Sequence, residues 1–118
     1  FPHFLGHADE VGTGKGAGFT HNYPMPPGTT FETWRDALAD ALQKITAFKP
    51  DALIISLGVD TFETDPISFF KLQSPDFTSY GTDIAALGLP TLFVMEGGYD
   101  IAEIGINTVN VLTGFEST

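Results

Sequence analysis

Two short apolar runs, residues 51–57 and 90–95, each lead directly into a polar turn, and they constrain the fold more than any other feature of the chain. Such continuous runs, rich in β-branched and aromatic residues, are typical of parallel strands that are buried on both faces. An amphipathic stretch lies between them. The order strand, helix, strand predicts a right-handed βαβ unit with parallel strands, and so an α/β fold.

Asp60 follows the first of these strands, and Tyr99 follows the second. Ligands of open α/β sheets bind outside the carboxyl ends of the strands, so neighbouring strands would place both side chains in one crevice. One could hold a metal and the other could donate a phenolic hydrogen bond. The alternative for Tyr99 is a half-buried aromatic after an ordinary turn at Gly97 and Gly98.

The turn after the first strand carries three carboxylates, Asp60, Glu63 and Asp65. They do not have the spacing of an EF-hand loop, which needs alternating oxygen ligands and a central glycine. We interpret Glu63 and Asp65 as solvated, and Asp60 as the candidate ligand because it lies closest to the strand end. The irregular stretch 58–74 is longer than most connections in compact domains, which favours a functional loop.

Three helices are predicted from apolar spacing. The first has its apolar stripe between Phe31 and Phe48, a capping box of Thr29 and Glu32, and an end at Lys49-Pro50. The second has Ser74 as N-cap and ends at Gly88. The third runs to Gly114, with Asp100 and Glu103 as its capping box and a buried stripe of Ile101, Ile104, Val109 and Leu112.

The amino-terminal part contains a glycine-dense segment, residues 12–18, and a possible short strand over 19–25. The glycine spacing fits neither the dinucleotide fingerprint nor the P-loop, so we interpret the segment as a bending loop and keep nucleotide binding as a distant alternative. His3, His7 and His21 lack the spacing of a helical zinc pair, and we do not assign them to a metal.

Composition limits the partners. The chain has 118 residues and a net charge of −10, which argues against nucleic acid and favours cationic partners such as amines or lysine-bearing peptides. From composition alone, an acidic surface that only keeps the protein soluble is an equally good interpretation. It has no cysteine, so any metal must use carboxylate and imidazole ligands. No apolar run approaches the length of a membrane span, and we expect no membrane association and a cytoplasmic location, which the lack of cysteine permits without requiring.

Two motifs resemble those of one enzyme family. Residues 57–66, LGVDTFETDP, resemble the zinc-aspartate motif G-x-D-x-x-x-x-D-P of the histone deacetylases, and Glu96-Gly97-Gly98-Tyr99 is similar to their catalytic tyrosine motif. The segments 1–7 and 21–26 resemble the stretch that joins the earlier ligands to the later part of that catalytic domain. Residues 104–107 and 114–116, with the tyrosine motif, look most like the acetylpolyamine amidohydrolases.

The resemblance implies part of a three-layer arginase–deacetylase α/β fold, in which residues 1–118 form the carboxy-terminal portion of one catalytic domain. It implies one catalytic zinc and hydrolysis of an acetyl amide of a polyamine or of acetyl-lysine. By carry-over, Asp60 is a zinc ligand and Tyr99 is the catalytic hydrogen-bond donor. Phe1 and Ile67 would line the substrate channel, and Gly97 would lie on its floor.

The family's D-x-H ligands and paired histidines have no counterpart in this sequence, and the chain opens on Phe1 as if cut from a longer protein. We therefore expect the 118 residues alone to be inactive and nearly zinc-free, and to self-associate through an exposed sheet edge or apolar faces. The alternatives are a self-associating α/β module without catalysis and, further off, a nucleotide-binding module.

Overall fold

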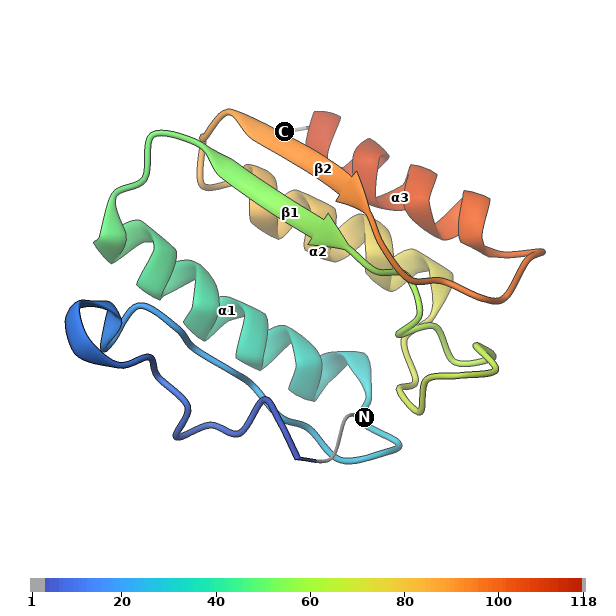
Figure 1. The fold of residues 1–118 in the computed structure, drawn as a ribbon. Helices are drawn as coiled ribbons and strands as arrows, with labels where there is room; N and C mark the ends of the chain where they lie inside the picture. Colours follow the sequence, from blue (N-terminus) through green and yellow to red (C-terminus); the bar gives the residue numbers. More distant parts are fainter. Residues whose placement is uncertain (1–3, 118) are drawn as a thin grey trace.

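The structure, a computed structural model, describes residues 4–117. Its elements in chain order are a short 3₁₀ helix, Gly14–Gly16, then α1 (Phe31–Phe48), β1 (Leu53–Leu57), α2 (Ser74–Ala85), β2 (Thr91–Met95) and α3 (Ile104–Glu116). β1 and β2 pair in parallel, with Leu53 opposite Thr91 and Leu57 opposite Met95. The predicted pair of parallel strands around a helix is therefore confirmed (Figure 1).

The prediction that both faces of these strands are buried is wrong for the described residues. Ile54, Leu92 and Val94 share one face of the sheet and are 68%, 58% and 40% exposed. α2 and α3 lie behind the sheet in Figure 1, and the ring of Phe93 contacts that of Phe115 in α3 at 5.2 Å between centroids. Within residues 4–117 the helices cover only this second face, so the outer face stays open.

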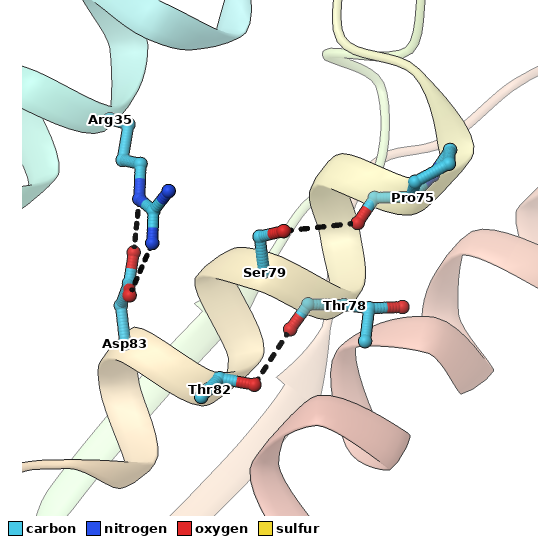
Figure 2. A network of polar contacts seen from close by, with 6 residues as sticks. All are labelled: Arg35, Pro75, Thr78, Ser79, Thr82 and Asp83. Atoms are coloured by element: carbon cyan, nitrogen blue, oxygen red, sulfur yellow. Dashed lines mark hydrogen bonds and ion pairs between the residues drawn. The ribbon is translucent and has the colours of Figure 1, made fainter.

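α1 packs beside α2 through its aromatic stripe. The rings of Trp34 and Tyr80 lie 4.8 Å apart, and the Arg35 guanidinium donates to both Asp83 oxygens at 2.8 and 2.9 Å (Figure 2). The helix has the predicted bounds, because Lys49 adopts a left-handed conformation that ends it. The predicted capping box is wrong: Thr30 is the N-cap, and the buried Thr29 hydroxyl donates to the Pro26 carbonyl instead.

α2 and α3 approach each other more closely than large side chains would allow. A Cβ on Gly81 would lie 2.2 Å from the Val111 carbonyl oxygen, and one on Gly114 would lie 2.0 Å from that of Thr78. Only a residue without a side chain fits at these two positions. The N-cap of α2 is Gln73, one residue before the predicted Ser74.

This crossing explains why the predicted buried stripe of α3 is largely wrong: of its four residues, only Ile104 packs against the core. Asn107, Val111 and Gly114 face α2 and are buried, whereas Ile101 and Val109 are 87% and 58% exposed. Gly114 lets this face of α3 approach α2 closely, and the spacing of apolar residues alone does not predict which face that is. The N-terminal cap of α3 also differs from the predicted capping box of Asp100 and Glu103.

α3 begins after Glu103, which is its N-cap. The Asp100 carbonyl accepts from the backbone N–H groups of Glu103 and Ile104. The Asp100 carboxylate accepts from the Thr64 hydroxyl, so it does not cap the helix.

Residues 4–30 form an extended segment that wraps the outside of α1 in Figure 1. The predicted strand over 19–25 is absent there, and the glycine segment bends sharply: Gly12, Gly14 and Gly18 have φ values of 96°, 58° and 86°. The interpretation of this segment as a bending loop is confirmed. In the described part of the chain, no helix combines the length and the apolar character that crossing a bilayer requires.

Candidate active site

The pairing of β1 and β2 continues past their carboxyl ends, and this keeps the two following loops together. The Glu96 N–H donates to the Leu57 carbonyl, and the Val59 N–H donates to the Gly97 carbonyl, both at 2.8 Å. Asp60 and Tyr99 therefore leave the sheet side by side, from the edge where ligands of such sheets bind.

Gly97 is the point at which the two candidate side chains meet. A Cβ on Gly97 would lie 2.7 Å from Asp60 Oδ2 and 3.4 Å from Tyr99 Cε2. A Cβ on Gly58 would lie 2.9 Å from Asp60 Oδ1. The carboxylate thus rests against two glycines, and the Tyr99 ring lies beside it on the face of Gly97 where a side chain would stand.

Gly98 has a separate reason to be glycine. Its φ of 149° is unfavourable for other residues, and a Cβ there would lie 2.6 Å from Val59 Cγ2. The two glycines before Tyr99 consequently do different things: Gly97 leaves room for the Asp60 carboxylate, and Gly98 lets the chain turn over Val59.

The loop between β1 and α2, residues 58–73, is anchored in the core. Phe62 and Leu72 form a bridge across its base and are 8% and 0% exposed. The Phe62 ring lies 6.3 Å from that of Phe77 in α2. Hydrogen bonds of Gly28 to Phe69 and of Lys71 to Thr29 tie the loop to the segment before α1. Asp60 thus lies on a loop held at both ends.

Asp65 is the residue of this loop that sequence reasoning missed. The interpretation that it is solvated is wrong: it is 7% exposed, and its carboxylate accepts hydrogen bonds from three backbone N–H groups. Oδ1 accepts from Ile67 at 2.9 Å and from Ser68 at 3.0 Å, and Oδ2 accepts from Tyr99 at 2.9 Å. The Asp65-Pro66 sequence was the available signal, because aspartate before such a turn commonly binds N–H groups two and three residues on. Glu63, in contrast, is exposed.

The Asp60 carboxylate differs from that of Asp65 in having no polar partner among residues 4–117. It is partly buried, yet within that range it accepts no hydrogen bond and forms no ion pair. The neighbouring Thr61 hydroxyl is buried and also lacks a partner in that part of the chain. Burial raises the pKa of the Tyr80 phenol beneath the loop, and the charge of Asp60 raises it further. Unpaired polar groups of this kind are typical of a place that another ligand or segment completes.

Asp60 has the chemistry of one metal ligand. Its oxygens are confined by Gly58 and Gly97, and carboxylate oxygen is an ordinary ligand of zinc. The residues that the structure describes contain no group of three His, Cys, Asp or Glu side chains that could hold a metal. Since catalytic zinc uses three protein ligands, Asp60 fits as one of a set that other residues would complete.

The other predicted site residues are placed as follows. Ile67 lies on the 58–73 loop, 55% exposed, with its backbone N–H held by Asp65. Phe1 and His3 lie outside the described residues. His7 and His21 are exposed residues of the amino-terminal segment.

Comparison with known proteins gives consistent results. A model of the histone deacetylase domain matches residues 1–115. Acetylpolyamine amidohydrolase of Mycoplana ramosa is 60% identical over 97% of this chain and 33% of that protein. Acetylpolyamine amidohydrolase 1 of Pseudomonas aeruginosa is 58% identical over 98% of this chain and 34% of that protein.

Comparison with a solved structure points to the same family. The crystal structure of acetylpolyamine aminohydrolase from Burkholderia pseudomallei superposes with a TM-score of 0.95 at 38% identity, over 99% of this chain and 34% of that one. This chain thus spans about a third of the length of these relatives. It has part of the arginase–deacetylase α/β fold, and it belongs to the histone deacetylase family.

Proposed function

We propose that the full-length protein, meaning this chain with any residues encoded beside it, hydrolyses acetyl amides of cationic amines. The observation that carries the proposal is the convergence of the Asp60 carboxylate and the Tyr99 ring on Gly97. The names of the relatives at 58–60% identity favour acetylpolyamines over acetyl-lysine peptides. The net charge of −10 supports a cationic substrate by electrostatic attraction.

Asp60 would hold a zinc ion together with residues from outside the described part of the chain. The chemistry that a bound zinc supplies is polarisation of the acetyl carbonyl and a lower pKa of its water. Tyr99 would donate its phenolic hydrogen to the carbonyl oxygen as that oxygen gains negative charge. Gly97 would form the floor between them, and Phe1 and Ile67 would line the approach.

The test compares variants of the full-length protein on an N-acetylated diamine and on an acetyl-lysine peptide. We expect Tyr99→Phe to lower kcat about 10²- to 10³-fold, the usual loss for one oxyanion donor, with zinc retained. Asp60→Asn should lower the zinc content measured by mass spectrometry. Tyr23→Phe and Glu63→Gln are the matched controls, because the Tyr23 hydroxyl donates to Asp40 in α1 and the Glu63 side chain is exposed. Full activity of Tyr99→Phe would refute the role of Tyr99.

We propose further that the 118 residues alone are inactive and self-associate. One carboxylate does not hold a catalytic zinc, which takes three protein ligands. The open sheet face of Ile54, Leu92 and Val94 provides an apolar surface for a second copy. Acetyl-amide hydrolysis by the isolated chain would contradict the first statement.

A further inference from the structure

The Asp65 carboxylate connects the two loops that carry Asp60 and Tyr99. Oδ1 is used within its own loop, by Ile67 and Ser68, whereas Oδ2 reaches the other loop and accepts from the Tyr99 N–H. Hydrogen bonds to an ionised acceptor are roughly twice as strong as neutral ones, and these are shielded from water at 7% exposure. The Asp65 side chain therefore stabilises its own turn and also binds the backbone of the Tyr99 loop.

A second hydrogen bond joins the same two loops at Asp100, the residue after Tyr99. The Thr64 hydroxyl donates to the carboxylate of Asp100. Consecutive residues of one loop, Thr64 and Asp65, are thus bonded to consecutive residues of the other, Asp100 and Tyr99. The two loops are held together at the place where Tyr99 leaves the backbone.

Tyr99 needs such an anchor because little else fixes it. Its side chain is 47% exposed and, among residues 4–117, makes no hydrogen bond. Two glycines precede it, and glycine has the most freedom of any residue to change its backbone conformation. Without a grip on its N–H, the phenol could take several positions relative to Asp60.

We infer that Asp65 is a positioning residue for Tyr99: by accepting the Tyr99 N–H it holds the phenol at a fixed place beside the Asp60 carboxylate. Asp65 touches neither substrate nor metal in this inference and acts only through Tyr99. The catalytic consequence rests on the proposed function, whereas the anchoring of the Tyr99 backbone does not.

Asp65→Asn in the full-length, zinc-loaded protein tests the inference. The carboxamide keeps one oxygen, which should stay with the two N–H groups of Ile67 and Ser68. Its NH₂ group then faces the Tyr99 N–H and cannot accept from it. The variant therefore keeps the hydrogen bonds of the turn and loses the one from the Tyr99 N–H. Glu63→Gln is the matched control, with the same loss of charge from an exposed position of the same loop.

We expect kcat of Asp65→Asn to fall about 10- to 100-fold with KM changed less than about twofold, because the phenol acts only in the transition state. In a Tyr99→Phe background the same substitution should lower kcat less than about twofold, since the group that Asp65 positions is already gone. Amide hydrogen exchange at Tyr99 should accelerate about tenfold or more, and the melting temperature should fall by only a few degrees relative to Glu63→Gln, as expected for the loss of one buried hydrogen bond.

Each other outcome overturns the inference in a distinguishable way. An equal loss of kcat in both backgrounds would show that Asp65 supports the structure in general and does not act through Tyr99. Unchanged kcat in Asp65→Asn, with Tyr99→Phe impaired, would reject positioning and leave the proposed function intact. If Tyr99→Phe is fully active, the proposed function fails and catalytic positioning fails with it. Unchanged exchange at Tyr99 would reject the anchor itself.

Discussion

Replacing Gly97 by alanine should separate the activity of this site from its stability. The added Cβ would lie 2.7 Å from Asp60 Oδ2, and ordinary contacts of this kind begin near 3.4 Å. The oxygen must therefore move by about 0.7 Å, and misplacements of this order in an active site cost up to about 10²-fold in rate. The Tyr99 ring, at 3.4 Å, already lies at a normal contact distance and has no need to move.

The free energy of unfolding should change little in this variant. The clashing atom is the end of a side chain that can rotate, and a strained rotamer costs about 0.5–1.5 kcal/mol. We expect kcat/KM of the full-length Gly97→Ala protein to fall about 10- to 100-fold, which corresponds to about 1.4–2.7 kcal/mol of transition-state stabilisation. Zinc affinity should fall as Asp60 is displaced.

The assay is hydrolysis of an N-acetylated diamine, with thermal unfolding of the same samples. Gly105→Ala is the control, because a Cβ on this exposed helical glycine would have no atom within 4 Å. It should retain activity and stability. A folded Gly97→Ala protein with kcat/KM within twofold of the wild type would refute the proposed crowding of Asp60 at this position. A large loss of stability without loss of activity would refute it as well.

Other predictions concern packing and association. Gly81→Ala places a Cβ 2.2 Å from a backbone oxygen that cannot rotate away, so α2 and α3 must separate; chemical denaturation should show a loss of about 1–3 kcal/mol, against no loss in Gly105→Ala. Light scattering of the isolated 118-residue chain should show association, and Val94→Lys on the open sheet face should weaken it. If light scattering showed a monodisperse monomer for both the unchanged 118-residue chain and Val94→Lys, the prediction of association would be wrong.

Much of the fold could be predicted from the sequence because the elements have strong local signals. The two apolar runs predicted the parallel pair β1 and β2, and the stripe between Phe31 and Phe48 predicted α1 with its bounds. Such patterns report what each segment buries. They do not report which neighbour it buries against, so the open face of the sheet and the buried face of α3 were missed.

The capping predictions failed for a related reason. Thr29 and Asp100 have the right side chains at the right spacing for helix caps, but both find other partners in the folded chain, Pro26 and Thr64. A cap is a local bond worth only about 1 kcal/mol, and a tertiary contact readily replaces it. Pairings between loops are set by the fold and are not encoded in the spacing of one segment.

The candidate site was predictable in position, and its internal bonding was not. The strand ends predicted that Asp60 and Tyr99 lie at one edge, and the structure brings both side chains against Gly97. The roles of these residues remain proposals. The burial of Asp65 depends on an N–H that lies 34 residues further along the chain, and no local pattern could reveal that partner.

The bridge between Phe62 and Leu72 restricts how this site can admit a molecule. Segments that open and close are drawn from regions with few buried contacts, and this loop has its two bridging side chains inside the core. Lifting it would expose both rings of the Phe62–Phe77 contact to water. A molecule that reaches the Asp60 carboxylate is therefore expected to do so without lifting Phe62 and Leu72 out of the core.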